Sequence, residues 1–193
     1  MCKNVFLVGV LVFLMVSCAS SSEMSGTLDQ KKKLDNMVFY KSFEMIADWA
    51  QPQMTNAMNS VANSGLIPPG SAPGQISLIG NPNYLRVKGD SVSAFLPYYG
   101  ERQMGGGYNT NQGASIKFDG IPRDFKITKR KRKKGYTATF DISDNTESYK
   151  VTLSLFPNLR GNIIVNSSQR FVIRYSGSIR EIDDEIQDSV QKD

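Results

Sequence analysis

The strongest constraint on the fold is a regular alternation of apolar and polar residues in the last third of the chain. Apolar side chains at every second position mark a strand with one buried and one exposed face. The apolar positions are Tyr136, Ala138, Phe140 and Ile142, then Tyr149, Val151, Leu153 and Leu155, then Ile163 and Val165, and finally Phe171, Ile173 and Tyr175. Turn-forming pairs separate these segments at Asp144-Asn145, Pro157-Asn158 and Ser167-Ser168. Short strands joined by such turns predict an antiparallel meander.

Shorter strands are predicted earlier in the chain. Their ranges are Phe43–Trp49, Gln75–Ile79, Tyr84–Val87, Ser91–Leu96, Ile116–Phe118 and Phe125–Thr128. Lys88-Gly89-Asp90 has the composition of a tight hairpin turn. The residue types of Phe43–Trp49 also fit a helix, and that alternative stays open. Residues 53–74 are rich in Asn, Ser, Pro and Gly, which predicts a long surface loop.

One helix is predicted ahead of the strands, over Leu28–Lys41. Thr27 and Gln30 have the spacing of a capping box at its start. The apolar residues that recur at helical spacing are Leu34, Met37 and Val38. We expect this helix to cover an edge or one face of the sheet.

The C-terminal residues 179–193 form an acidic segment that is either a short helix or a frayed tail. Ser178 and Glu181 offer a second capping box, and both alternatives stay open. Because strands and helices do not alternate along the chain, a parallel nucleotide-binding sheet is disfavoured. The expected fold is mainly β (α+β): residues 28–178 form a single domain, a curved antiparallel sheet shaped as a half-barrel or sandwich, with a short N-terminal helix.

The first 17 residues have the parts of a lipoprotein signal peptide. Lys3 is followed by an apolar run from Val5 to Val16, which is shorter than the roughly 20 residues that span a bilayer. Leu14 to Cys18 reads Leu-Met-Val-Ser-Cys and is similar to the bacterial lipobox. We therefore expect cleavage before Cys18 and acylation of its thiol; the alternative is an uncleaved anchor.

An acylated Cys18 predicts where the protein is located. Residues 18–27 are Ser-rich and nearly uncharged, which is typical of a flexible tether. Ala19, rather than Asp, follows the cysteine, and by analogy with other lipoproteins this points to the outer membrane. The absence of an acidic run after it argues for the periplasmic side.

The composition excludes several kinds of chemistry. The chain has no histidine, and its two cysteines are Cys2, in the signal peptide, and Cys18. A mature chain of this kind has no Ser-His-Asp or Cys-His nucleophile pair and no usual zinc site, so we expect neither metal nor cofactor. Catalysis is not expected; the carboxylates that a hydrolase would need are Asp90, Glu101, Asp119 and Asp124.

The positive charge of the chain is concentrated in one run. The formal net charge is +5, and six consecutive residues are basic: Lys129, Arg130, Lys131, Arg132, Lys133 and Lys134. Such a run attracts anionic partners such as lipid headgroups. The alternatives are a solvated hairpin tip that protects a sheet edge, and pairing with the acidic tail. Nucleic acid is not expected, because the run has no interleaved aromatic residues.

A second candidate site is an aromatic loop around Gly105-Gly106-Gly107. Its members are Tyr98, Tyr99, Arg102 and Tyr108. Aromatic faces stack on sugars or peptides, and glycines allow close approach. The alternative is a strand end whose tyrosines cap the core. The glycines do not form a phosphate loop, because no Lys-Ser/Thr pair follows them.

Four phrases of the sequence resemble a known family. They are FEMIADWAQP (43–52), NYLRVKGDSVSAFLPYYG (83–100), IKFDG (116–120) and SQRFVIRYSG (168–177). Together they are similar to the Bacteroidota lipoproteins of domain-of-unknown-function family 4251. The resemblance implies the envelope location and the β architecture, and it implies no catalytic residues.

Taken together, these features predict a membrane-anchored envelope lipoprotein that acts as a non-catalytic binding or assembly module. Its expected partners are the membrane, through the N-terminal lipid, and an envelope protein. The alternative is a periplasmic carrier of a lipid or other apolar ligand. A carrier needs a cavity lined by inward residues of the meander, such as Phe140, Val151, Leu153 and Ile173.

Overall fold

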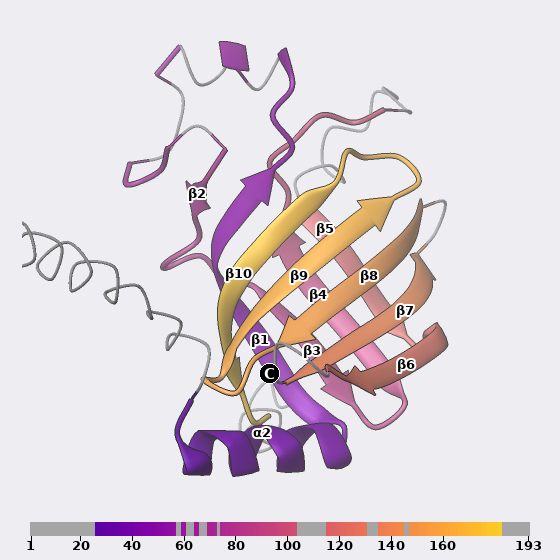
Figure 1. The fold of residues 1–193 in the computed structure, drawn as a ribbon. Helices are drawn as coiled ribbons and strands as arrows, with labels where there is room; N and C mark the ends of the chain where they lie inside the picture. The colour runs from indigo at the N-terminus through magenta and orange to yellow at the C-terminus, as the bar shows by residue number, and fades with distance from the viewer. Residues whose placement is uncertain are drawn as a thin grey trace, which may run out of the picture.

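The computed structural model describes residues 26–56, 59–60, 64–65, 69–72, 74–103, 115–130, 135–144 and 147–182. They form a mainly β fold with one α-helix of three turns (Figure 1). The elements are α2 Leu28–Phe39, β1 Ser42–Pro52, β2 Ile76–Ser77, β3 Tyr84–Lys88, β4 Ser91–Pro97, β5 Ser115–Gly120, β6 Arg123–Lys129, β7 Tyr136–Asp144, β8 Glu147–Leu155, β9 Arg160–Ser167 and β10 Ile173–Arg180.

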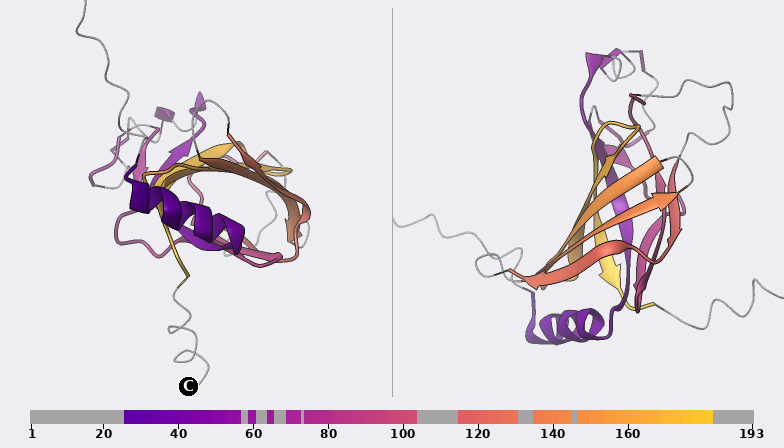
Figure 2. Two further views of the ribbon diagram at one scale, coloured as in Figure 1. Left: turned by 60° about the horizontal axis from the view of Figure 1, so that its bottom comes forward. Right: turned by 90° about the vertical axis from the view of Figure 1, so that its right-hand side faces the viewer.

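The strands form one antiparallel sheet in the order β5-β4-β3-β1-β10-β9-β8-β7-β6, with β2 paired to β1 beside this path. The sheet curls so far that β5 contacts β7, although β5 and β6 lie at its two margins (Figure 2). The ring centroids of Phe118 and Phe140 are 6.1 Å apart across this seam. The predicted curved antiparallel half-barrel is confirmed, and because there is a single sheet the sandwich alternative is not formed.

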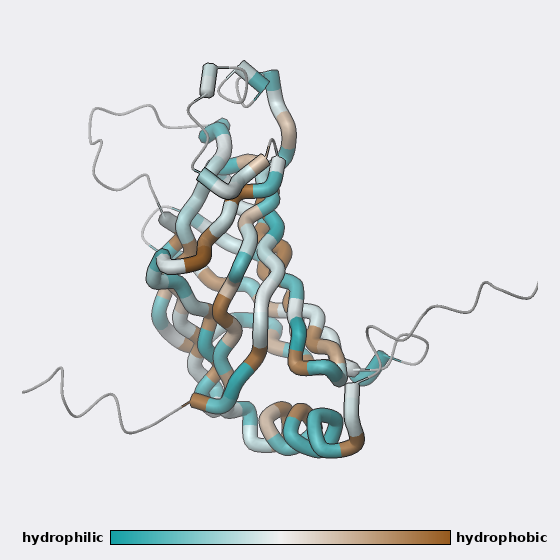
Figure 3. Tube along the Cα trace, turned by 90° about the vertical axis from the view of Figure 1, so that its left-hand side faces the viewer, coloured by the Kyte–Doolittle hydropathy of each residue, from teal (hydrophilic) through white to brown (hydrophobic). Residues whose placement is uncertain are grey.

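The core fills the inside of the curled sheet. Apolar and polar residues alternate along the strands (Figure 3), as a half-buried sheet requires. The inward positions of the predicted meander are buried, including Phe140, Val151, Leu153 and Ile173. Helix α2 lies across one end of the barrel, and its Leu34 and Met37 join the same core (Figure 2). The helix thus covers the end of the sheet rather than an edge or a face.

Local interactions and backbone geometry determine where α2 begins and where it ends. The backbone N–H of Gln30 donates to Thr27 Oγ1 at 3.2 Å, and that of Thr27 donates to Gln30 Oε1 at 2.9 Å, so the predicted capping box is confirmed. The helix ends at Phe39, two residues before the predicted end. Lys41 has a φ of 49°, and this left-handed backbone turns the chain into β1.

Strand β1 corrects one detail of the predicted alternation. The residues are a strand and not a helix, and Phe43, Met45 and Ala47 are buried as expected. A β-bulge shifts the register between Ala47 and Trp49. Trp49 is therefore only half-buried, and Ala50 takes the inward position.

The second predicted capping box is wrong. Ser178 lies within β10, where it pairs with Ile46 of β1 and with Arg160 of β9. Ile179 is 3% exposed. Two neighbouring strands satisfy the backbone there, which leaves no place for a helix start at Ser178. Residues 183–193 of the acidic segment lie outside the described residues.

One predicted turn is confirmed, and two predicted strands differ in length. The Lys88-Gly89-Asp90 hairpin turn is confirmed: Lys88 pairs with Ser91, and Gly89 has a φ of 61°. Strand β2 covers only two of the five predicted residues. Strand β10 begins at Ile173, so Phe171 belongs to the preceding connection rather than to the strand.

The barrel has two different ends, and we name them by their contents. The helix end carries α2, the β3–β4 and β8–β9 turns and the end of β10, whereas the loop end carries the connections after β4, β7 and β9 (Figure 1). No helix among the described residues is both long enough and apolar enough to cross a bilayer.

Candidate functional site

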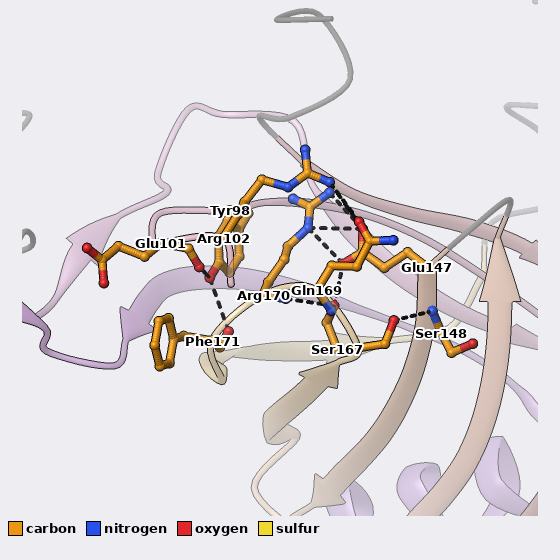
Figure 4. Close-up of polar contacts among 10 residues, drawn as sticks. Tyr98, Glu101, Arg102, Glu147, Ser148, Ser167, Gln169, Arg170 and Phe171 are labelled. Atoms are coloured by element: carbon orange, nitrogen blue, oxygen red, sulfur yellow. Dashed lines mark hydrogen bonds and ion pairs between the residues drawn. The ribbon is translucent and has the colours of Figure 1, made fainter. Parts of the chain in front are cut away.

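The loop end holds a polar cluster that includes two members of the predicted aromatic loop. Tyr98 and Arg102 follow β4, and they meet Glu147, the first residue of β8, and Arg170, in the connection between β9 and β10 (Figure 4). Residues from two connections, the one after β4 and the one between β9 and β10, thus converge on a carboxylate at the start of β8.

Glu147 and Arg170 form a buried, bidentate ion pair at the centre of this cluster. Arg170 Nε donates to Glu147 Oε1 at 2.8 Å, and Arg170 Nη2 donates to Glu147 Oε2 at 3.1 Å. The exposed fractions of the two side chains are 8% for Glu147 and 3% for Arg170. The Ser167 hydroxyl also donates to Glu147 Oε1.

The electrostatics of Glu147 follow from this geometry. Burial alone raises the pKa of the carboxyl, but hydrogen bonds from Arg170 and Ser167 outweigh burial, and the pKa lies below its ordinary value. Glu147 is therefore a carboxylate at neutral pH. Its charge is already neutralised by Arg170, so it is not poised to exchange a proton there.

Arg102 adds a second guanidinium to the same carboxylate. Its Nη2 donates to Gln169 Oε1 at 3.3 Å and lies 3.8 Å from Glu147 Oε2, and its side chain is 34% exposed. The backbone holds it there, because Arg102 and Arg170 form an isolated antiparallel bridge. Two guanidinium groups face the Glu147 carboxylate, and Arg102 lies on the outer side of the cluster.

Tyr98 is a structural residue of this end. Its hydroxyl lies 2.8 Å from the carbonyl oxygen of Glu101 and 3.1 Å from that of Phe171, within donating distance of both. The Arg170 guanidinium lies 5.0 Å from the centre of its ring. Burial raises the pKa of the Tyr98 hydroxyl. Its ring is therefore part of the core wall, as the core-capping alternative predicted.

The other members of the predicted aromatic loop are less informative. Tyr99 is partly buried and packs against the core. Tyr108 lies outside the described residues. Of the four predicted residues, the structure therefore brings Tyr98 and Arg102 to one cluster and leaves Arg102 as the member that solvent reaches.

Sequence reasoning missed Glu147 and Arg170, although one signal was present. Glu147 stands in phase with Tyr149, Val151 and Leu153, at a position of β8 that points inward. A charged residue in phase with buried positions needs an internal partner. The sequence alone does not say which of the many arginines supplies it.

A second buried carboxylate lies on the outer wall of the barrel. Glu44 of β1 accepts from Arg86 Nε of β3 at 2.7 Å and from Arg180 Nε of β10 at 2.6 Å. The side chain is 4% exposed because the two arginines cover it. These two ion pairs link the three neighbouring strands β3, β1 and β10, so we assign them a structural role.

The basic run begins at the helix end. Lys129 is the last residue of β6, and its Nζ lies 5.8 Å from the ring centre of Tyr136, its partner on β7. The backbone N–H of Arg130 donates to the carbonyl of Gly135 at 2.9 Å. The run thus falls in the connection between β6 and β7. Lys131, Arg132, Lys133 and Lys134 lie outside the described residues.

The carboxylates considered for hydrolysis are spread over the molecule. Asp90 lies in the β3–β4 turn at the helix end and binds Lys41 Nζ at 2.8 Å, whereas Glu101 lies at the loop end. Asp119 belongs to β5 and Asp124 to β6. Over the described ranges, no three His, Cys, Asp or Glu side chains are grouped so as to hold a metal ion.

Comparison with known proteins gives the family. The model of the Domain of unknown function (DUF4251) matches residues 27–179. The chain belongs to the DUF4251 family. The match extends the resemblance of residues 43–177 to include α2 and nearly all of β10.

A solved structure shares the fold of this DUF4251 chain. It is the crystal structure of a DUF4251 family protein from Bacteroides eggerthii DSM 20697, with a TM-score of 0.53 and 15% sequence identity. The likeness covers 79% of this chain and 88% of the other. The comparison with curated proteins finds no match.

Proposed function

We propose that this protein is an envelope lipoprotein, acylated at Cys18 and held at the periplasmic side of the outer membrane, and that its barrel is a non-catalytic binding or assembly module. The lipobox supports the anchoring, and the filled interior of the barrel supports the module.

The filled interior is the observation that carries this choice. Tyr175 of β10 donates from its hydroxyl to the carbonyl of Pro97, at the end of β4, over 2.9 Å. This bond passes behind β1 and β3, inside the barrel. The Phe140 ring packs against Phe118 and Phe125, at centroid distances of 6.1 and 6.0 Å.

A carrier needs open volume where these side chains lie. The four residues proposed to line a cavity are at most 2% exposed and share one core with Leu34 and Met37 of α2. Close-packed positions support a module that acts through its surface, whereas an apolar ligand needs a cavity of a few hundred Å³. The carrier remains the second candidate because the sheet is not closed between β5 and β6.

The loop end is the surface that we assign to the partner. Arg102 is its partly exposed cation, and Arg170 already neutralises Glu147. An acidic segment of an envelope protein would pair with Arg102 without displacing the buried pair.

Labelling tests the anchor. Cells that express the full chain are grown with radioactive palmitate; the wild type incorporates label, and the Cys18→Ser variant does not. A Cys18→Ser chain that is labelled as strongly as the wild type would contradict acylation at this residue.

Native mass spectrometry of protein purified from its own envelope tests the module. We expect a protein companion, and Arg102→Gln should release it, because this change removes the charge without placing a second carboxylate beside Glu147. Lys150→Gln, which makes the same change of charge on the barrel wall, is the control and should keep the companion. A co-purifying lipid in place of a protein would favour the carrier.

A further inference from the structure

Helix α2 exposes two large apolar side chains, Leu28 and Phe39, on the face that is opposite the core, and no described residue covers them. Leu28, Lys32 and Phe39 stand at i, i+4 and i+11, so they share the face opposite Leu34 and Met37. Leu34 and Met37 are 1% and 2% exposed, whereas Leu28 and Phe39 are 78% and 79% exposed. A helix that packs by one stripe normally has a polar opposite face, and this one carries two large apolar side chains there.

More exposed apolar residues gather at the same end. Tyr40 is 70% exposed and packs edge-on against Phe39, with ring centroids 5.1 Å apart. Ile121, which is 77% exposed, follows Gly120, and Gly120 pairs with Val92 beside the β3–β4 turn. Lys41 Nζ binds Asp90 of that turn at 2.8 Å. Four of the six large apolar residues that are exposed in the described part of the chain therefore lie at the helix end.

Cations surround these apolar side chains. Lys31, Lys32 and Lys33 are exposed on α2. Lys129, the last residue of β6, adds another cation, because the Tyr136 hydroxyl beside it donates to Asp35 of α2 at 2.7 Å. The guanidinium of Arg130 instead packs over the Phe156 ring, 5.4 Å from its centre, with Nη1 buried. The carboxylates on the helix are Asp35, held by that bond, and Asp29 in the first turn. Asp90 and Glu181 also lie at this end, where they pair with Lys41 and Lys33, so the excess of basic over acidic residues on this surface is small.

The chain enters the barrel at this end. Gly26 lies against the backbone of Pro157 in the β8–β9 turn, where an added Cβ would stand 2.4 Å from the Pro157 oxygen. Cys18 and Thr27 are nine residue steps apart, and a fully extended chain spans about 3.5 Å per step, so Cys18 is at most about 30 Å from α2. Acyl chains on Cys18 would thus hold the helix end within about 30 Å of the bilayer.

We propose that the helix end docks on the anionic phospholipid headgroups of the leaflet that holds the acylated Cys18. Leu28, Phe39, Tyr40 and Ile121 enter the interface, and the lysines of α2 lie against the phosphates. This inference rests on the lipid anchor of the proposed function. It adds an orientation, in which the loop end points away from the membrane toward the partner.

The acidic C-terminal segment is the rival occupant of this surface. Glu181 follows β10 and lies 3.5 Å from Lys33 of α2, so that segment starts beside the same lysines. Its further acids are Asp183, Asp184, Glu185, Asp188 and Asp193. These acids complement the cations, and the same segment also carries the apolar residues Ile182, Ile186 and Val190. The membrane is the favoured occupant because the tether from Cys18 reaches the barrel at this end, where Gly26 lies against Pro157.

Vesicle sedimentation tests the docking. A chain that starts at residue 19 retains every described contact, since all of them lie within residues 26–182, and it has no acyl group. We expect it to sediment with phosphatidylcholine vesicles that contain about one third phosphatidylglycerol, to stay in solution with phosphatidylcholine alone, and to be released by salt.

Matched variants separate this surface from general charge. Lys31→Gln with Lys32→Gln should weaken vesicle binding by about 25-fold, at roughly fivefold for each cation. Leu28→Ser with Phe39→Ser should also weaken it. Lys117→Gln with Lys150→Gln removes the same charge from exposed wall positions and should change binding less than twofold. All variants should unfold at the wild-type temperature, because the altered side chains are exposed.

Three results would overturn the proposal. They are no binding to the anionic vesicles, an equal loss from the wall variant, and binding that appears only after truncation at residue 182, which would make the acidic segment the occupant. None of them concerns acylation, because the assay contains no acyl group. A wild-type chain that incorporates no palmitate, conversely, would refute the anchor and leave the vesicle result intact.

Discussion

The two ends of the barrel are closed by opposite means. At the loop end, the Glu147–Arg170 pair joins β8 to the connection between β9 and β10, and Arg102 adds the segment after β4 from the outer side. At the helix end, α2 inserts Leu34 and Met37 into the core. Charge pairing demands particular partners, whereas apolar packing demands only shape and volume. The loop end is thus the more specific structure, and the helix end presents apolar and basic side chains to a broad surface.

Breaking the buried pair should give the largest effect. Glu147→Ala leaves Arg170 charged, buried and without its carboxylate, and we expect a loss of about 3 to 5 kcal/mol in the free energy of unfolding, measured with urea. Asp119→Ala on the exposed wall should cost about 0.5 kcal/mol or less. A Glu147→Leu, Arg170→Met double variant should regain much of the loss. A small effect of Glu147→Ala would show that the loop end does not depend on the pair.

Shortening a core side chain of α2 should have the next largest effect on stability. Leu34 is 1% exposed, and Leu34→Ala removes buried volume from the core, with an expected cost of about 2 to 4 kcal/mol by the same measurement. Lys32→Ala changes the opposite face of α2 and should leave the free energy of unfolding nearly unchanged. Equal losses of unfolding free energy in the two variants would contradict the packing of α2 into the core.

Acid should act selectively on the loop end. The pKa of Glu147 lies below its ordinary value of 4.5 in the folded protein, because hydrogen bonds from Arg170 and Ser167 outweigh the effect of burial. A depressed pKa stabilises the fold above the unfolded value and loses this stabilisation as the pH falls through the folded value. The gap in unfolding temperature between wild type and Glu147→Gln should therefore shrink below about pH 4.5. A gap that stays constant down to pH 2 would disprove the assignment.

Alkali should act on the helix end, with the smallest effect. Burial, together with the hydrogen bond to the Asp35 carboxylate, raises the pKa of Tyr136 from 10.0 to about 12. Above pH 10 the unfolded chain ionises first, so stability falls as the pH rises and levels off near the folded value. Tyr136→Phe should show less of this decline than the wild type in thermal unfolding between pH 9 and pH 11. Identical curves would mean that the bond to Asp35 is not kept in solution.

The parts of the fold that follow from residue types were predictable. Strict alternation from Tyr136 to Leu155 predicts β7 and β8 because a period of two has one structural meaning. The bulge at Trp49 was not predictable, since an extra residue in the backbone leaves no trace in side-chain chemistry.

The residues of the candidate site also divide into those that the sequence predicted and those that it did not. Arg102 was predicted from its place beside aromatic residues, whereas Arg170 was missed because 23 positions separate it from Glu147. A charged residue in phase with buried ones indicates that a partner exists, and only the folded sheet identifies that partner. The basic run was visible, but the location of its first residue, Lys129, beside α2 required the Tyr136–Asp35 contact.

The seam between β5 and β6 has a mechanical consequence. These consecutive strands are the two margins of the sheet and are not paired with each other, so the described wall can widen along this line without losing a ladder hydrogen bond. Aromatic rings are what fasten it, with Phe118 of β5 against Phe140 and Tyr149. At this line the circumference of the barrel is therefore held by contacts among three aromatic rings and not by backbone hydrogen bonds between strands.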